Sequence, residues 1–99
     1  MIRAYRLHKN KPLGDEEVSR MSNDVANTLL VQDNYEVVTG GNPVSGIKII
    51  LHYTPKGVTV ICYKGTITFT SGRDDAIDSA VRSVRSKVGA RGVKLEEIK

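Results

Sequence analysis

The chain has 99 residues, which leaves room for one domain and no more. Hydrophobic residues make up 39% and charged residues 26% of it, so a globular protein is expected rather than a disordered one. Its one cysteine, Cys62, cannot form an internal disulfide, which favours an intracellular protein, cytoplasmic or nucleoid-associated. The net charge of +4 is compatible with nucleic-acid binding but does not require it.

The charge is unevenly distributed along the chain. Residues 15–36 carry a net charge of −5, residues 37–72 one of +3 and residues 73–99 one of +2. Residues 1–14 hold four basic side chains and no acid: Arg3, Arg6, Lys9 and Lys11. We weigh two interpretations of this basic run equally. It contacts phosphate groups, or it is a solvated edge strand whose charge prevents aggregation.

The first half of the chain begins with a strand and a helix. Residues 1–8 are expected to form the strand, which the Pro-Leu-Gly run at 12–14 ends. Apolar residues spaced by three and four then predict a helix over 15–32, with Asp15 as its N-cap. No apolar run is long enough to span a membrane, so no membrane partner is expected.

Four strands joined by short turns come next and predict an antiparallel meander. They are expected at residues 35–39, 47–53, 58–63 and 66–70, with a turn cluster at 40–43.

A second helix follows at about 73–88. Aspartates near its start and basic residues near its end match the helix dipole, and Gly89 is the expected C-terminal cap. We expect a single domain over 1–92, and residues 93–99 are either a short extra strand or a tail.

Alternation divides the meander into two faces. One is almost purely apolar and should lie under the helices: Ile47, Ile49, Leu51, Tyr53, Val58, Val60, Cys62, Ile67 and Phe69. The opposite face mixes apolar residues, hydroxyls and a lysine: Lys48, Ile50, His52, Thr59, Ile61, Tyr63, Thr66, Thr68 and Thr70. If exposed, such a face marks an interaction site; alternatively, a loop or the C-terminal segment covers it.

Catalytic and metal-binding chemistry is weakly indicated. His8, His52 and Cys62 are the only residues of the soft-metal type, and no two have the spacing of a zinc site. By alternation, His52 and Cys62 point to opposite faces, which also excludes a Cys–His nucleophilic pair. We therefore expect no catalytic residue, no metal and no cofactor, and the chain is not expected to be an enzyme.

Residues 58–89 carry a pattern that can be compared with a known family. A strand leads through Lys64-Gly65 into a second strand, and Thr70-Ser71-Gly72 precedes a helix with basic residues in its second half. This pattern resembles the second half of one repeat of the TATA-box-binding protein family. The order of elements over residues 1–89 also resembles one such repeat.

The resemblance implies an α+β, TBP-like fold. A curved antiparallel sheet, in the order strand, helix, four strands, helix, would carry both helices on one face. In the family the other face is a concave saddle that lies in the DNA minor groove, where phenylalanine wedges open base steps. Here Cys62 and Tyr63 occupy the region where a wedge is expected. The family joins two repeats in one chain, so a homodimer of this chain would rebuild the saddle by two-fold symmetry.

Single copies of the TBP-like fold also occur as accessory nucleic-acid-binding domains, as in the N-terminal part of some ribonucleases H, and that comparison asks for fewer special residues. Two other small folds share much of this order of elements. Double-stranded-RNA-binding domains need lysines at the start of the last helix, where this chain has Asp74 and Asp75. Ribosome hibernation factors use basic helices, whereas helix 15–32 is acidic.

The sequence therefore leaves two alternative functions for this protein. The first is a nucleic-acid-binding module for duplex DNA or RNA, with DNA favoured, acting as a homodimer. The second is a protein-interaction or regulatory module without enzymatic activity. The expected contact residues for nucleic acid or a partner are Lys48, Ile50, His52, Thr59, Ile61, Tyr63, Thr66, Thr68, Thr70, Arg3 and Arg6. A protein partner would also meet the helix surface through Arg82, Arg85 and Lys87, as the resemblance implies.

Overall fold

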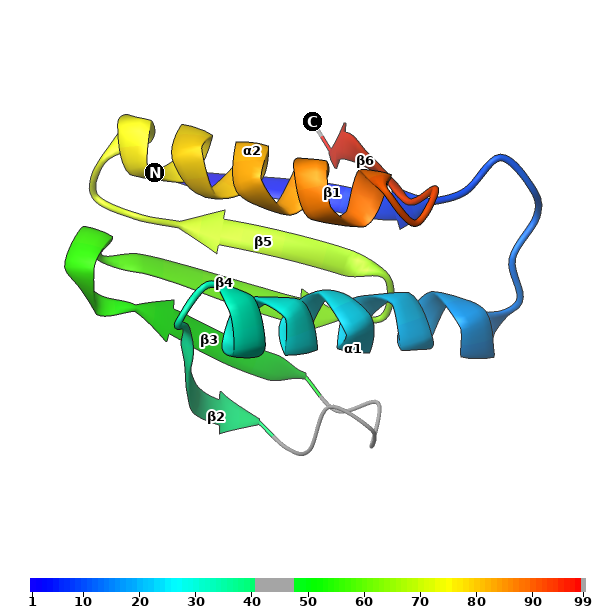
Figure 1. Ribbon diagram of the computed structural model, residues 1–99, viewed down its shortest axis with the longest axis horizontal. Coiled ribbons are helices and arrows are strands. Elements are labelled where there is room, and N and C mark those ends of the chain that lie inside the picture. Colours follow the sequence, from blue (N-terminus) through cyan, green and yellow to red (C-terminus); the bar gives the residue numbers. More distant parts are fainter. Residues whose placement is uncertain (41–47, 99) are drawn as a thin grey trace.

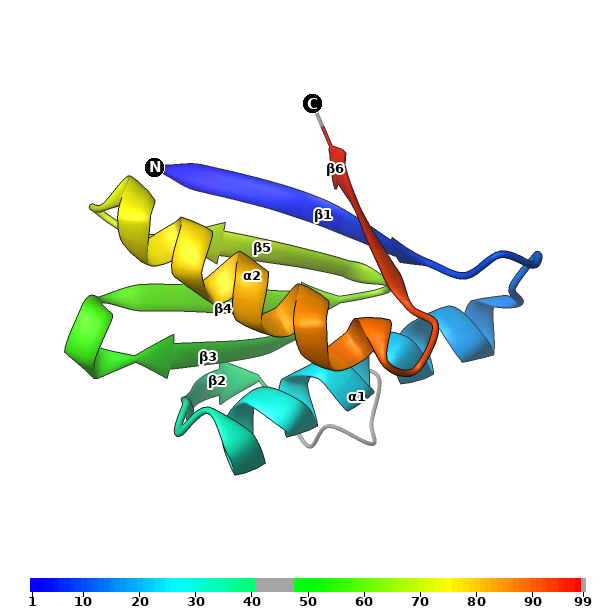
Figure 2. The same cartoon turned by 45° about the horizontal axis from the view of Figure 1, so that its top comes forward.

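The fold is an open antiparallel sheet with both helices on one side (Figures 1 and 2). The computed structural model describes residues 1–40 and 48–98. Its elements in chain order are β1 (Ile2–His8), α1 (Asp15–Gln32), β2 (Glu36–Gly40), β3 (Ile49–Tyr53), a 3₁₀ turn (Thr54–Lys56), β4 (Val58–Tyr63), β5 (Thr66–Thr70), α2 (Asp74–Gly89) and β6 (Lys94–Ile98). Within the described residues these strands form one six-stranded sheet in the order β2-β3-β4-β5-β1-β6.

The α+β class, the antiparallel meander and the first helix are confirmed. Helix 15–32 forms as predicted, and the second helix is shifted by one residue from the predicted 73–88. Residues 94–98 form a sixth strand that pairs with β1, so the strand alternative for the C-terminal segment is the correct one. Ile47 and most of the predicted turn at 40–43 lie outside the described residues.

Both predicted helix caps are wrong. Gly14 occupies the N-cap of α1, and Asp15 is the first helical residue. With Glu16 and Glu17 it fills the first turn, where carboxylates stabilise the positive end of the helix dipole without capping it. Gly89 is the last residue of α2, and Ala90 is the C-cap. The left-handed residue of this turn comes later, at Gly92 (φ +79°), because the chain makes another turn before β6.

The core lies between the sheet and the two helices. Ile49, Leu51, Val58, Val60, Cys62, Ile67 and Phe69 are each at most 1% exposed, and this confirms the predicted helix side of the sheet. Tyr5 and Leu7 of β1 join them, and the Tyr5 ring meets Phe69 edge-on at 5.8 Å between centroids. The helices contribute their apolar stripes, including Val25, Leu29, Ile77 and Val84. Burial of this surface is the main force that holds the layers together.

Asp33 connects the two helices. It is the C-cap residue of α1, and its carboxylate accepts a hydrogen bond from Ser83 Oγ of α2 at 3.3 Å. The Lys87 ammonium, one turn further along α2, forms an ion pair with the same carboxylate. The Asp33 side chain is only 16% exposed, so both polar partners meet it in a partly dehydrated position.

The β4–β5 turn packs tightly against α1. Lys64 (φ +46°) and Gly65 (φ +79°) are both left-handed, as in the two-residue turns that suit the twist of a hairpin. The Gly65 N–H donates to Ser22 Oγ of α1, and the Gly65 carbonyl accepts from the Leu7 N–H of β1 at 2.8 Å. A Cβ atom on residue 65 would lie 2.1 Å from Val18 Cγ1. Only glycine fits this position.

Gly65→Ala is expected to lower the free energy of unfolding by about 3 kcal/mol, because the left-handed conformation and the forced repacking of Val18 each cost about 1–2 kcal/mol. The matched control is Gly57→Ala, since Gly57 has a similar φ of +61° but no atom within 4 Å of the added Cβ. That variant should lose about 1 kcal/mol. Urea unfolding followed by circular dichroism measures both. Equal losses in the two variants would contradict the close approach to Val18.

Candidate nucleic-acid interface

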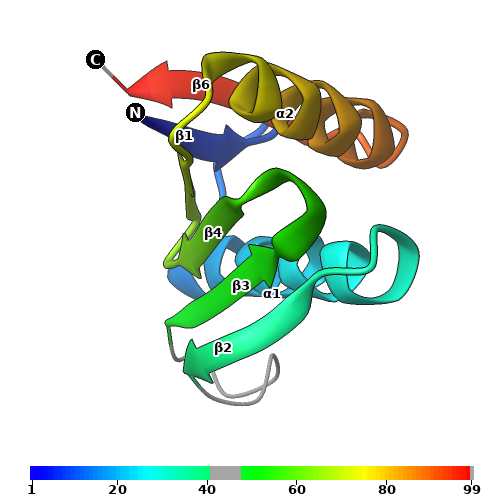
Figure 3. The same cartoon turned by 90° about the vertical axis from the view of Figure 1, so that its left-hand side faces the viewer.

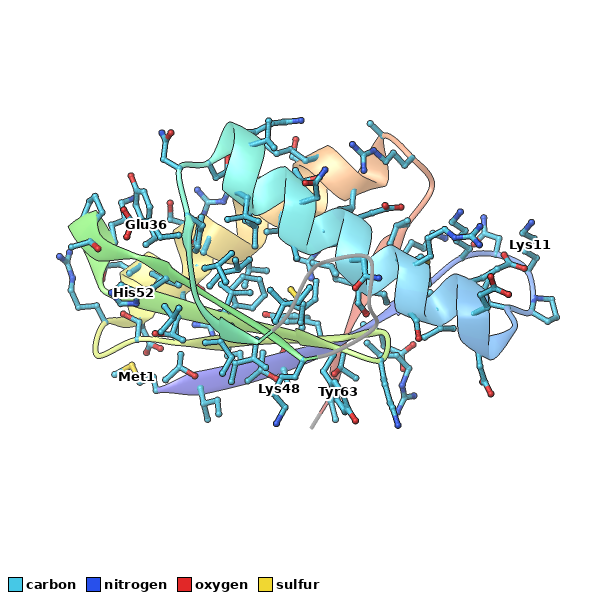
Figure 4. The ribbon with its side chains drawn as sticks, turned by 90° about the horizontal axis from the view of Figure 1, so that it is seen from below. Met1, Lys11, Glu36, Lys48, His52 and Tyr63 are labelled. Carbon is cyan, nitrogen blue, oxygen red and sulfur yellow. The ribbon has the colours of Figure 1, made fainter. Side chains whose placement is uncertain are left out.

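The candidate site is the face of the sheet that points away from the helices, which we call the open face. Strand register places its residues in three rows across the strands. The first row is His52, Thr59 and Thr70, the second is Ile50, Ile61 and Thr68, and the third is Tyr63, Thr66 and Arg6. Viewed from the edge, the helices lie above the sheet, and Lys48 and Tyr63 project below it (Figure 4).

Residues from β1 and β6 extend these rows. Ile2 lies opposite Thr70, and Ala4 lies between Thr68 and Ile98. Ile2 and Ile98 are 68% and 40% exposed. The C-terminal segment does not fold over the open face, because β6 continues the sheet beside β1 (Figure 3). The middle row is therefore an apolar band that crosses the sheet from β3 to β6.

Tyr63 is the most prominent aromatic group on this face. It is the last residue of β4, and its side chain is 38% exposed. The Lys48 ammonium lies 5.5 Å and the Lys64 ammonium 5.3 Å from the centre of its ring. Both distances allow a cation–π attraction. Thr66 Oγ1 donates to the Tyr63 carbonyl at 2.6 Å and anchors the main chain beneath the ring.

Lys64 was predicted from the sequence as part of a turn, but it was not among the predicted contact residues. It occupies the first central position of the two-residue turn, where asparagine, aspartate or glycine is usually found. A left-handed conformation costs a residue with a Cβ atom roughly 1–2 kcal/mol. The chain thus bears some backbone strain at Lys64 and gains a second ammonium beside Tyr63. The sequence signalled the position of this ammonium only through the Lys64-Gly65 pair. The direction of the Lys64 side chain could be inferred from that pair only if the type of the turn was known.

Positive charge gathers around the third row. Arg6 is exposed and lies across from Thr66, and the Lys48 and Lys64 ammonium groups lie close to the Tyr63 ring. Within residues 1–40 and 48–98, none of these three cations lies within 4 Å of a carboxylate. Glu96 of β6 continues the third row directly opposite Arg6, and Glu36 of β2 lies opposite His52 in the first row. The third row thus carries more cations than carboxylates, and its end around Tyr63 is suited to an anionic ligand.

Arg3 and Arg6 separate onto opposite faces. Arg3 lies on the helix side and binds α2, with Nη1 2.5 Å from Asp78 Oδ1 and Nη2 3.5 Å from Asp74 Oδ1. The hydrogen bond to Asp78 raises the pKa of the Arg3 guanidinium above its usual value. The predicted site residues Arg3 and Arg6 therefore do not come together, and only Arg6 belongs to the open face.

The basic residues of α2 also divide. Arg82 and Arg85 are exposed and line a groove of about 540 Å³ between α2 and β1, together with Tyr5 and Ser86. The Arg85 guanidinium lies 5.7 Å from the centre of the Tyr5 ring. Lys87 instead faces α1 and forms the ion pair with Asp33. Two of the three predicted residues thus share one groove on the helix side of the molecule.

The potential metal and nucleophile residues are kept apart. His52 lies on the open face, with Nδ1 3.1 Å from Thr59 Oγ1, and Cys62 is buried on the helix side. Burial raises the pKa of the Cys62 thiol to about 12. Among residues 1–40 and 48–98, no cluster of three His, Cys, Asp or Glu side chains could hold a metal ion.

Comparisons with known proteins add no assignment. No protein-family model matches the chain, and neither the characterised proteins nor the solved structures searched contain a significant match. None of the described helices is both long and apolar enough to cross a membrane.

We expect Cys62 to be almost unreactive in the folded protein at pH 8, because a thiol with a pKa of about 12 forms little thiolate and this one is 1% exposed. The measurement is the rate of reaction with a chromogenic disulfide reagent. In unfolding concentrations of urea the same cysteine should react rapidly, which serves as the control. Fast modification without urea would show that the helix side of the sheet opens readily.

Proposed function

We propose that the protein is a small nucleic-acid-binding module that uses the open face of its sheet, with DNA as the favoured ligand. The observation that carries the proposal is the exposed Tyr63 ring, which has the Lys48 and Lys64 ammonium groups 5.5 Å and 5.3 Å from its centre and lies in line with Arg6. Cations bind phosphates, and an exposed aromatic ring offers contact to bases or sugars. The proposal assigns no catalytic residue and no cofactor.

The rest of the open face supports the same ligand. Its threonines present methyl and hydroxyl groups side by side, which suits sugar and base edges better than a uniformly charged surface would. The resemblance to a TATA-box-binding protein repeat supports this face as well, because that family binds DNA with the sheet surface that its helices leave open. A TBP-like fold and a concave shape of the open face are part of the proposal.

Binding to duplex or single-stranded DNA is expected to weaken steeply as salt rises from about 50 to 200 mM, because phosphate contacts release counterions. Lys48→Gln and Lys64→Gln should each weaken binding roughly threefold to tenfold and lower the salt slope by about one. Fluorescence anisotropy with labelled oligonucleotides measures both effects.

The control for these variants is Arg20→Gln, which removes one positive charge from α1 on the other side of the sheet. Arg20 is ion-paired with Glu16 at 3.2 Å and is exposed. Its replacement should leave DNA affinity nearly unchanged. A salt-independent affinity, or an equal loss in all three variants, would contradict binding through the open face.

A homodimer is the second part of the proposal, because one copy supplies only half of the two-repeat saddle it resembles. β6 occupies the outer edge of β1, so within the described sheet a second copy could extend it only at β2 or β6. The β6 edge carries Lys94, Glu96 and Glu97, and such charges discourage edge pairing. β2 is the better edge, with Val37 and Val38 at 47% and 61% exposure.

Sedimentation velocity should detect this dimer, and Val38→Lys at the β2 edge should return it to a monomer because a buried ammonium opposes the contact. Glu97→Lys at the β6 edge is the control and should leave the dimer intact. If the protein is a monomer at all accessible concentrations, a saddle rebuilt from two copies is excluded. The proposal that a single copy binds DNA would then still stand.

A protein partner is the second candidate function, favoured by the groove of Arg82 and Arg85 beside Tyr5. The groove is also lined by Glu97 and by the ion pair of Arg3 with Asp78, so its surplus of positive charge comes from the two exposed guanidinium groups of Arg82 and Arg85, which suit an acidic peptide segment. Charge substitutions separate the two functions, because Arg82→Gln with Arg85→Gln removes this groove's charge and keeps the open face. If that double variant loses DNA binding while the Lys48 and Lys64 variants keep it, the helix side is the nucleic-acid surface instead.

A further inference from the structure

We infer that the open face binds single-stranded DNA, with an unpaired base stacked on the Tyr63 ring and the neighbouring phosphates on Lys48 and Lys64. This inference rests on the proposed nucleic-acid binding and names its ligand. It comes from the arrangement of three side chains on one face: an exposed ring at the end of β4, one ammonium from the residue before β3 and one from the β4–β5 turn.

The two ammonium groups lie close enough to the ring to reach the two phosphates that flank one stacked base. Each lies close to the ring, at 5.5 Å and 5.3 Å from its centre. A nucleotide in a strand has a phosphate on either side, a few ångströms from its base. When a base takes a place against the ring, the flexible lysine stems let each ammonium exchange its cation–π contact for a stronger pairing with a phosphate.

A duplex cannot use this arrangement. Its bases are already stacked on one another, so the ring could reach a base face only by opening a base step. Side chains that open steps from the minor groove are apolar wedges such as phenylalanine or leucine. Two lysine ammonium groups lie close to the Tyr63 ring, and inserting the ring into a base step would strip water from both of them. An unpaired base removes both costs.

The surroundings of Tyr63 favour DNA over RNA. Its nearest open-face neighbours along and across the strands are Ile61, Thr66 and Lys48, with Ile50 opposite Ile61. The Thr66 hydroxyl donates its one proton to the Tyr63 carbonyl, so it can only accept a hydrogen bond from a ligand, and Thr59 pairs with His52. The isoleucines offer apolar contact to the deoxyribose ring. A ribose 2′-hydroxyl over them would lose water without gaining a strong hydrogen-bond partner.

The test compares three labelled oligomers of about 12 nucleotides, within the usual site size for small single-strand binders: oligo(dT), oligo(rU) and a blunt DNA duplex. At low salt, oligo(dT) should bind at least about tenfold more tightly than the duplex, because stacking on one ring is lost in duplex DNA. Tyr63→Leu should lose about tenfold in oligo(dT) affinity and keep its duplex affinity, whereas Tyr63→Phe should behave as the parent protein.

A second measurement reports the stacking directly. The chain contains no tryptophan, so Tyr63→Trp introduces a single indole on the open face. Its fluorescence should be quenched on adding oligo(dT) and change little with the duplex. Tyr63 is exposed, so circular dichroism of all the variants should remain that of the parent protein.

The outcomes separate this inference from the proposed function. Duplex binding as tight as oligo(dT) binding, or equal losses in Tyr63→Leu and Tyr63→Phe, would overturn the inference and leave DNA binding by the open face in place. Tighter binding of oligo(rU) than of oligo(dT) would overturn the choice of DNA. Binding of no oligomer at low salt would overturn the proposed function itself.

Discussion

Burial of one apolar sheet surface under two helices is the constraint on which this molecule depends. Strand alternation puts β-branched and aromatic residues on the helix side, where Phe69, Ile49 and Leu51 are completely buried. Two helices are enough to cover that side of a sheet of this width. The same alternation assigns the threonines, Tyr63 and Arg6 to the other side, which the described elements leave open to water. The candidate site is thus a consequence of the core, because it is the half of each strand that the core does not use.

The parts of this arrangement that could be predicted from the sequence are those that follow from the regular spacing of apolar residues. The first helix and the assignment of residues such as Val60 and Ile61 to opposite faces follow from spacings of three, four and two. The helix caps were predicted wrongly, because capping at Gly14 depends on how the chain enters α1 and not on which residue type is the best cap. The spacing of apolar residues also did not decide whether the C-terminal segment is a strand or a tail. A run as short as residues 94–98 forms a strand only when it can pair with the free edge of β1.

The contacts that were missed join residues far apart in the chain. Arg3 binds Asp78, 75 residues later, so its basic character is used on the helix side, away from the open face. Lys87 is held by Asp33 across the helix pair, which removes it from the surface shared by Arg82 and Arg85. The Lys64 ammonium lies beside Tyr63 because the turn at Lys64 is left-handed, and that conformation was not evident from the sequence. Such pairings depend on the three-dimensional arrangement, and a single sequence carries no direct sign of them.

The position of β1 has a consequence for how the chain acquires its structure during synthesis. β1 lies between β5 and β6, so its partners are residues 66–70 and 94–98. While the ribosome is still making the middle of the chain, the N-terminal strand has no neighbour to pair with, and Tyr5 and Leu7 have no core to enter. A sheet assembled from such distant segments closes late and slowly. β1 is therefore synthesised before both of its partner strands and is among the last strands of the sheet to be fixed in place.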